Sequence, residues 1–346
     1  MSGPTIAALA KAAGVSLSTV NRLLHGTGTV RPETADRIVA VAHQIGFYGL
    51  GALRGRKRDN LPQRTLGFLM QQSHRALYRM WAEHITTAAA SRTDAVVTAV
   101  VKFEDDLAPE AVAENLLMLG HKAEAVAVVT ADHPLVSQAI DELKQRGVPV
   151  VAYVTDLSAA SRAGFVGTDS WKAGRTAAWF LSQMAHVNGT IVPLIGSHRY
   201  QCQDISDASF RSYMREHAPE FHVNDTLLTE EEPDRAYEIV RTLMTKEAEL
   251  RGIFVNGGGI SGVLRAMREL DPSRQRRLRV VCRDIGPETR KGLGEGLVTA
   301  ALRQPLERTP QELIDVMLRL LEERATSSIE QRIVPFEIVT PESLWT

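Results

Sequence analysis

Nine short runs of β-branched and small apolar residues recur from residue 65 onward, and longer helix-forming stretches separate them. The runs are TLGFLM, AVVTAVV, AVAVV, VPVVAYV, GFVGTD, TIVPLIG, GIFVN, RVVCRDI and TAALRQ. Strands that alternate with helices form parallel sheets with helices on both faces, because each parallel connection must cross over the sheet. Nine strands are more than one sheet usually needs. The sequence therefore predicts two α/β lobes over residues 65–346, with a ligand crevice at the carboxyl ends of the strands.

The sequence of residues 1–48 predicts a small all-α domain of three helices. Thr5 and Ser16 each precede a helical stretch and have the side chain of an N-cap, while Pro32 suits a first helical turn. Glycines follow the helices and suit the left-handed conformation of a C-cap. The predicted helices cover residues 5–12, 16–24 and 32–45. Apolar residues at helical spacing predict a core of Ile6, Leu9, Ala10, Val15, Val20, Leu23, Leu24, Ile38, Val41 and Ala42.

The stretch between these two parts, GLGALRGRKRDNLPQR at 49–64, is predicted to be a hinge or linker. It is rich in glycine and strongly basic, and Pro62 stands near its end. Residues 1–64 hold nine Lys and Arg against three Asp and Glu, a balance of +6 within a total of −1. The rest of the chain therefore carries −7. This charge asymmetry indicates that the head and the linker, and not the rest of the chain, bind a polyanion.

The composition is that of a globular protein, with 44% hydrophobic and 23% charged residues. The amino terminus has no secretion signal and no apolar run is long enough for a membrane span, so we expect a cytoplasmic protein. The two cysteines are Cys202 and Cys282, and no His or Cys stands at metal-ligand spacing. We therefore expect no disulfide framework, no metal and no cofactor.

The motif AALAKAAGVSLSTVNRLL at 7–24 carries the most specific functional signal. A helix, a tight turn at Gly14 and a second helix form the helix-turn-helix arrangement, in which the second helix enters the major groove of DNA. Leu17 can contact a thymine methyl group, with Ser18 beside it. Asn21 and Arg22 can bond base edges or phosphates. An ordinary pair of surface helices is the alternative.

At these residues the chain resembles the LacI/GalR family of repressors. The family's motifs have counterparts in AGVS at 13–16, TVNR at 19–22 and VRPETADRI at 30–38, and the segment Gly46-Phe47-Tyr48 resembles the end of the family's head. The resemblance implies a DNA-binding regulator that acts as a homodimer on a pseudo-palindromic operator. It implies that Leu17 and Ser18 discriminate between operators. The other implied contacts, mainly to phosphates, are made by Thr5, Ser16, Arg22, Thr34 and Tyr48.

Two features depart from the family pattern. Asn21 stands where the family usually has Ser. The family's hinge motif N-P-x-A-x-x-L is replaced by YGLGALRGRKR, in which Leu53, ahead of Leu50, is our candidate for the leucine that wedges into the minor groove. The basic residues expected to neutralise phosphates are Arg54, Arg56, Lys57 and Arg58. A plain flexible basic linker is the alternative.

The body resembles the periplasmic sugar-binding fold that these repressors share with ribose-binding proteins, over residues 65–340. The resemblance implies a ligand loop in QQSHRALY and further ligand contacts after later strands, where amides and carboxylates bond sugar hydroxyls. The implied effector residues are Gln72, His74, Tyr78, Asp156, Asn256, Asp284 and Gln304. Where many members have a ligand-binding arginine this chain has Asp204, which favours a neutral sugar or polyol over an acidic effector. A helix cap is the alternative role for this aspartate.

Two other functions compete with this interpretation. GGGISG at 257–262 satisfies G-x-G-x-x-G, follows a predicted strand and precedes Asp284 by about twenty residues, as in a dinucleotide-dependent oxidoreductase. The motif lies late in the chain and lacks an accompanying catalytic His-carboxylate or Tyr-Lys arrangement, so we expect a tight turn and no enzymatic activity. A sugar-binding module without DNA function is the second alternative, which the head disfavours. The final residues, RIVPFEIVTPESLWT, show no tetramer-forming heptads and suit an added edge strand.

Overall fold

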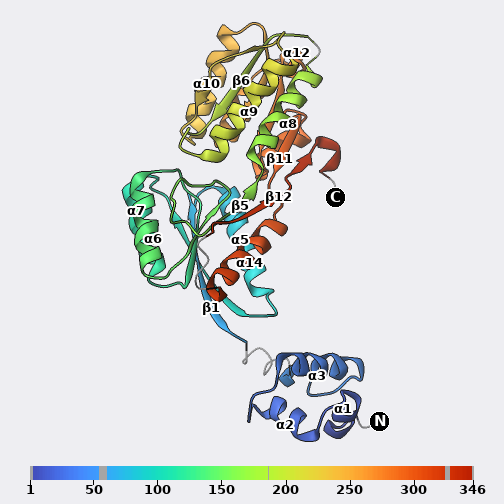
Figure 1. Ribbon diagram of the computed structural model, residues 1–346. Coiled ribbons are helices and arrows are strands. Elements are labelled where there is room, and N and C mark those ends of the chain that lie inside the picture. The colour runs from blue at the N-terminus through green and yellow to red at the C-terminus, as the bar shows by residue number, and fades with distance from the viewer. Residues whose placement is uncertain (1–2, 54–60, 186, 324–327, 345–346) are drawn as a thin grey trace. The chain divides into compact units, whose positions relative to one another are not determined.

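The computed structural model describes residues 3–53, 61–185, 187–323 and 328–344. The head consists of α1 (Ile6–Ala12), α2 (Leu17–His25) and α3 (Pro32–Gln44) (Figure 1). Thr5 caps α1 by accepting from the Ala8 N–H (3.2 Å), and Ser16 caps α2 by accepting from the Thr19 N–H (3.2 Å). These contacts satisfy amides that the helix itself leaves without partners. The predicted helices are confirmed, with ends that differ by at most one residue.

The core of the head joins all three helices. Leu9, Val20, Leu23 and Ile38 are at most 1% exposed. The same cluster contains Ala10, Ala13, Val30, Ala35, Ala42, Phe47 and Leu53, with Ile6, Val15, Leu24, Val41 and Leu50 packed against it. The predicted core is confirmed, and the structure extends it to residue 53, beyond the end of α3.

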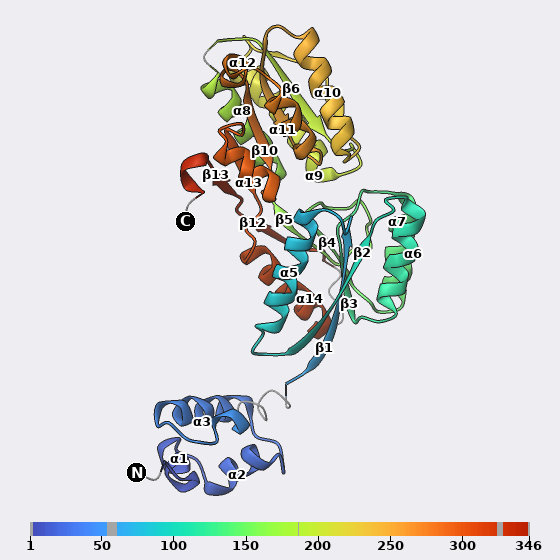
Figure 2. The same cartoon turned by 180° about the vertical axis from the view of Figure 1, so that it is seen from behind.

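The amino-terminal lobe of the body is a six-stranded sheet in the order β12-β5-β4-β3-β1-β2. Its strands are β1 (Gln63–Gln71), β2 (Val96–Glu104), β3 (Ala125–Val128), β4 (Val150–Tyr153), β5 (Gly164–Thr168) and β12 (Glu330–Val334). Helices cover both faces of the sheet (Figures 1 and 2). On one face lie α6 (Pro109–Gly120) and α7 (Pro134–Gln145), and on the other α5 (Ala76–Ala90) and α14 (Arg308–Glu322).

The carboxyl-terminal lobe is built on a second sheet in the order β13-β11-β10-β9-β6-β7, with β8 also paired to β6. Its strands are β6 (Thr190–Ile195), β7 (His222–Val223), β8 (Leu227–Leu228), β9 (Leu250–Val255), β10 (Arg279–Arg283), β11 (Ala300–Arg303) and β13 (Glu337–Val339). The helices are α8 (Ser170–Met184), α9 (Gln201–His217), α10 (Pro233–Lys246), α11 (Ile260–Arg268), α12 (Pro272–Arg277) and α13 (Pro287–Gly294), and a short 3-10 helix spans Pro341–Ser343. Two separate apolar clusters pack α8 with α9 and α10 with α11 against the strands.

The chain passes between the lobes three times. It leaves the amino-terminal lobe between β5 and α8, returns between β11 and α14, and leaves again between β12 and β13. Strands of each sheet pair in parallel, except that β13 runs antiparallel to β11. The carboxyl ends of the parallel strands are therefore where polar loops of both lobes meet.

All nine predicted strands are confirmed, as β1 to β6, β9, β10 and β11. The two-residue strands β7 and β8 were not predicted, because such short runs carry no alternation pattern. The suggestion that the final residues add an edge strand is confirmed twice over, since β12 and β13 each lie at the edge of one sheet. Within the described residues, the helices fall short of the length and apolar character that a membrane span requires.

Candidate functional site

A pocket of about 360 Å³ lies between loops of the two lobes of the body. The amino-terminal lobe contributes the start of α5 and the loops after β3 and β4, and the carboxyl-terminal lobe contributes the loops after β6, β8, β9 and β10. Its polar lining consists of His74, Arg75, Tyr78, Thr155, Tyr200, Cys202, Gln203, Glu231, Asn256, Ser261, Arg283, Asp284, Glu288 and Thr289. This volume lies within the range of small-molecule sites.

Backbone strain is concentrated around this pocket. Within the described residues, the non-glycine residues with positive φ are Gln72 (43°), Val154 (68°), Glu230 (52°), Glu231 (64°) and Asp284 (64°). Each follows the carboxyl end of a strand. A β-branched residue such as Val154 pays a particularly high steric cost in this region. Because strained residues cluster at binding sites, the backbone indicates the same site as the cavity does.

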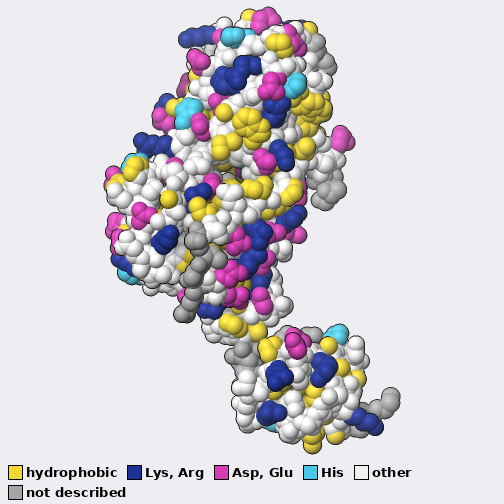
Figure 3. All heavy atoms as spheres, in the orientation of Figure 1, with side chains coloured by type: hydrophobic (Ala, Val, Ile, Leu, Met, Phe, Trp, Pro, Cys, Tyr) yellow, Lys and Arg dark blue, Asp and Glu magenta, His cyan; other side chains and the backbone are white. Residues whose placement is uncertain are grey.

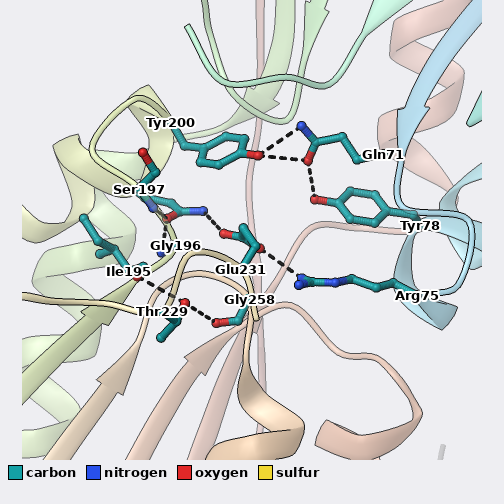
Figure 4. Close-up of polar contacts among 11 residues, drawn as sticks. Gln71, Arg75, Tyr78, Ile195, Gly196, Ser197, Tyr200, Thr229, Glu231 and Gly258 are labelled. Atoms are coloured by element: carbon teal, nitrogen blue, oxygen red, sulfur yellow. Dashed lines mark hydrogen bonds and ion pairs between the residues drawn. The ribbon is translucent and has the colours of Figure 1, made fainter. Parts of the chain in front are cut away.

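Aromatic residues form one wall of the pocket. The Tyr78 hydroxyl donates to Gln71 Oε1 (2.9 Å), and Gln71 Nε2 donates to the Tyr200 hydroxyl (3.0 Å), which links the two lobes (Figure 4). Trp81 packs edge-on against Tyr78, with ring centroids 5.4 Å apart. Burial raises the pKa of Tyr78 well above its ordinary value, so this hydroxyl stays protonated and remains a donor.

An ion pair crosses the pocket. Arg75 Nη1 lies 3.0 Å from Glu231 Oε2, and Gln203 Nε2 donates to Glu231 Oε1 (2.9 Å) (Figure 4). Gln203 Oε1 in turn accepts from the Gly196 N–H (2.7 Å). The Arg75 atoms Nε and Nη2 are buried without a hydrogen-bond partner among the described residues, so they are available to a ligand.

The remaining polar groups come from strands β9 and β10. Asn256 is 2% exposed and donates through Nδ2 to the Gln203 carbonyl (2.7 Å), while its Oδ1 has no partner within the described part of the chain. Arg283 donates to hydroxyls, including that of Thr168 (3.0 Å). Burial raises the pKa of Asp284. Asn256 and Asp284 therefore offer acceptors, and Arg75 offers donors, around one cavity.

Four of the predicted effector residues line the pocket, namely His74, Tyr78, Asn256 and Asp284. Gln72 and Gln304 are 2% and 3% exposed beside it, but they do not belong to its lining. Gln304 instead donates its backbone N–H to Asp284 Oδ1 (3.1 Å).

Asp156 and Asp204 do not lie in the pocket. Asp156 forms a two-point ion pair with Arg162 (2.6 and 2.9 Å), which occupies its carboxylate within its own lobe. The side chain of Asp204 is 55% exposed in the first turn of α9, and its carboxylate contacts His198 (2.9 Å). Asp204 therefore does not line this pocket, whose arginines, Arg75 and Arg283, come from other elements; that Asp204 replaces a ligand-binding arginine stays a prediction.

The sequence reasoning missed the most interconnected side chains of the site. Arg75 lies in the QQSHRALY loop already singled out, and Arg283 directly precedes Asp284. These two had a local signal, since Arg75 follows a predicted strand and Arg283 lies near the end of another. Tyr200, Gln203 and Glu231 follow β6 and β8 at distances that only the folded loops define. Among the described residues, no group of three or more His, Cys, Asp or Glu is placed to hold a metal ion.

The glycines of the GGGISG segment serve close packing. Gly259 is the N-cap of α11 at φ 102°, and a Cβ at Gly262 would overlap the Pro233 carbonyl at the start of α10. A Cβ at Gly258 would overlap both Glu231 and Arg75. The prediction of a tight turn is confirmed, and the glycines make room for protein groups.

Of the predicted DNA-contacting residues of α2, Leu17 and Ser18 begin the helix, Asn21 lies in its middle and Arg22 in its last turn. The Leu17 side chain is 49% exposed, which leaves an apolar group free on the surface, and Ser18 and Arg22 are exposed. Asn21 is half-buried. Tyr48 is 77% exposed and its ring packs against Phe47 at 4.7 Å. Thr34 is half-buried near the start of α3.

Leu53, the candidate wedge, is fully buried in the core of the head. Residues 50–53 are helical and bring this side chain under Phe47 and the other core residues. In this structure Leu53 is therefore a core residue, and insertion between bases would require it to leave that core. The basic run of Arg54, Arg56, Lys57 and Arg58 lies outside the described residues.

Known proteins match both parts of the chain. Residues 5–49 match the lacI family of bacterial regulatory proteins, and residues 66–325 match the periplasmic binding protein domain. Comparison with curated proteins gives no match.

Solved structures share the two-lobed fold. An ABC transporter solute binding protein from Burkholderia graminis C4D1M in complex with D-arabinose is similar with a TM-score of 0.74 and 17% identity, over 83% of this chain and 98% of that chain. One from Agrobacterium vitis with bound D-fucose has a TM-score of 0.72 and 15% identity, over 81% and 97%. GanP, a glucose-galactose binding protein from Geobacillus stearothermophilus, has a TM-score of 0.72 and 15% identity, over 82% and 99%. Neither matching family is one of dehydrogenases, so the oxidoreductase alternative has no support. Because a lacI-family head precedes a periplasmic binding protein domain that spans most of the chain, the protein belongs to the LacI/GalR family of DNA-binding transcriptional regulators.

Proposed function

We propose that this protein is a cytoplasmic repressor whose operator affinity is controlled by a neutral sugar or polyol. The observation that carries the proposal is the presence, in one chain, of a helix-turn-helix head and a body with a pocket of about 360 Å³ between two lobes. The head is assigned to residues 1–48, the hinge to 49–64 and the effector and dimerisation domain to 65–346; the first residues of this hinge, up to Leu53, pack into the core of the head. The protein acts by binding and carries out no catalysis.

The chemistry of the pocket favours a neutral ligand. Arg75 is already neutralised by Glu231, and Arg283 donates to the hydroxyls of Ser170, Ser206 and Thr168, so protein groups already engage both guanidinium groups. The unpartnered Asn256 Oδ1 and the Asp284 carboxylate suit hydroxyl donors, and the Trp81 and Tyr78 rings suit the apolar face of a sugar. Structural relatives of the same fold contain D-arabinose, D-fucose and D-allose.

The DNA contacts are assigned to the exposed end of α2 and its neighbours. Leu17, Ser18 and Asn21 would read bases, and Thr5, Ser16, Arg22, Thr34 and Tyr48 would contact the backbone. Over the visible face of the body, acidic side chains are interspersed among the basic ones (Figure 3). This favours the head as the DNA-binding part. One small head binds weakly, so we assign a homodimer that reads two half-sites.

The test combines operator selection with ligand titration. Full-length protein is used to select from a random duplex DNA pool, and the selected duplex is then titrated in the presence of neutral sugars, polyols, sugar acids and sugar phosphates. We expect a pseudo-palindromic duplex whose affinity changes with one neutral ligand. The variant Arg22→Ala should weaken selection, while Asn256→Ala should retain selection and lose the ligand response. No enrichment of any duplex would refute the regulator assignment, and a response to sugar acids alone would refute the neutral effector.

A further inference from the structure

The Arg75–Glu231 ion pair joins the two lobes of the body directly. Arg75 belongs to the amino-terminal lobe and Glu231 to the carboxyl-terminal lobe, and the two side chains point toward each other across the pocket (Figure 4). Their side chains are 16% and 6% exposed. An ion pair this well shielded from water is weakened little by salt, and removing one partner leaves an uncompensated charge.

Three features of the surroundings are built around this pair. Glu231 has φ 64°, a strained conformation for a glutamate, and the carboxylate it presents is held by both Arg75 and Gln203. A Cβ at either Gly196 or Gly258 would overlap the Glu231 carboxylate. The two glycines thus leave room for the Glu231 carboxylate, and the strained backbone directs it toward Arg75. An ordinary ion pair on the surface needs neither feature.

Further hydrogen bonds join the same two edges. Gln71 Nε2 donates to the Tyr200 hydroxyl (3.0 Å), Gln201 Nε2 donates to Asp132 Oδ2 (3.1 Å) and the Asp132 N–H donates to the Arg199 carbonyl (2.8 Å). These contacts are neutral or partly exposed, whereas the Arg75–Glu231 pair joins two opposite charges within the cavity wall. Opening the lobes would separate these two charges and let water reach both, so the pair holds the lobes together by the amount that its attraction exceeds the cost of desolvating the two groups.

We propose that Arg75 and Glu231 form a latch that holds the two lobes of the body together. The role of this latch in regulation rests on the proposed function, because the latch borders the proposed effector pocket. An effector enters and leaves through openings of the lobes that the latch limits. Glu231 is a positioning residue, since it also fixes the Arg75 guanidinium with Nε and Nη2 left available.

Cys202 is a built-in reporter of opening. It lines the pocket, and its backbone N–H donates to Thr155 Oγ1 of the opposite lobe (3.3 Å). Cys282, the other thiol, is fully buried in the core of its own lobe. Cys202 is partly exposed, so a disulfide reagent labels it at a basal rate in the closed arrangement, and lobe separation adds to that rate. The increase of a variant over the unmodified full-length protein, measured without DNA or sugar, therefore reports opening of the lobes.

The variants are Arg75→Met, Glu231→Gln and the double variant. We expect each to label Cys202 about tenfold faster than the unmodified protein, and the double variant to be no faster than the singles, because both changes break one pair. Glu231→Gln also removes a negative charge that raises the pKa of the Cys202 thiol, which by itself favours labelling. Arg75→Met removes a positive charge, which does not increase the fraction of Cys202 present as the reactive thiolate. Faster labelling of this variant is therefore caused by opening of the lobes.

Two matched variants complete the test. Gly258→Ala keeps both charges but places a methyl group where the pair lies, and it should also speed labelling, whereas Gly294→Ala, with open space around it, should not. Glu230→Gln breaks the exposed neighbouring pair with Arg235 (2.6 Å) and should label at the unmodified rate. Unchanged labelling of folded Arg75→Met and Gly258→Ala would overturn the latch. Because neither DNA nor effector is present, that failure would leave the proposed function standing.

Discussion

The Asp284 carboxylate accepts a hydrogen bond from the Gln304 backbone N–H (Oδ1 to N, 3.1 Å). Asp284 follows β10 in the wall of the pocket, and Gln304 begins the segment that returns from the carboxyl-terminal lobe to α14. A displacement of Asp284 in the pocket wall would therefore act directly, through this hydrogen bond, on a segment that connects the two lobes. This contact gives the pocket a physical route to the arrangement of the body.

Asp284→Asn should increase stability more at neutral pH than at acidic pH. Burial raises the pKa of Asp284 in the folded state, so the folded protein holds its proton more tightly than the unfolded chain does. This contribution is complete below the ordinary aspartate pKa and is lost as the pH rises through the raised value. Asparagine carries no charge and avoids that loss. The measurement is the free energy of unfolding in urea from pH 4 to pH 8, with Asp141→Asn at an exposed position as the control. The same pH dependence of this free energy in both variants would contradict the prediction.

Leu53→Ala should destabilise the head by about 2–5 kcal/mol, since it leaves a cavity among tightly packed residues. Leu53 is fully buried, whereas Leu50 is only partly so, and Leu50→Ala should cost less. Hydrogen exchange of the α1 to α3 amides in the full-length protein measures the loss. A head that stays equally protected while operator affinity falls would show instead that Leu53 serves mainly as a minor-groove wedge.

Arg22→Ala should weaken binding to all duplexes alike and reduce the slope of log affinity against log salt by about 1, as expected for one lost phosphate contact. Leu17→Ala, by contrast, should alter which duplex is preferred, because an exposed apolar group can only read base methyls. Arg37→Ala on α3 is the control for loss of charge alone. Equal salt slopes for the Arg22→Ala and unmodified proteins would remove Arg22 from the phosphate contacts.

Val154→Gly should cost at least about 1 kcal/mol less than Val151→Gly, although both side chains are buried. Val154 has φ 68°, which glycine adopts without steric cost, whereas Val151 lies within β4 and gains nothing from glycine. Denaturant midpoints of the two variants provide the measurement. Equal losses would mean that the strain at Val154 is negligible beside its packing.

The three-helix head and the strands of the two-lobed body were predictable because they depend on local signals. Caps at Thr5 and Ser16, Pro32 in a first turn and helical spacing of Leu9 and Val20 act within a few residues of one another. The strands of the body were likewise marked by continuous buried runs such as AVAV in β3. The burial of Leu53 was not predicted, because it depends on packing against the head that a glycine-rich sequence does not reveal.

The sequence alone determined the helix-turn-helix head, the parallel two-lobed body and the segments after strands that contain His74, Tyr78, Asn256 and Asp284, since periodicity and capping are properties of neighbouring residues. The tertiary structure decided which polar side chains share one cavity. It placed Asp156 beside Arg162 and Asp204 on the surface, and it brought Arg75 to Glu231, 156 positions away in the chain. The physical reason is that this ion pair forms only when the two lobes meet. It also needs the space that Gly196 and Gly258 leave in two further loops, and neither condition has a local sequence pattern.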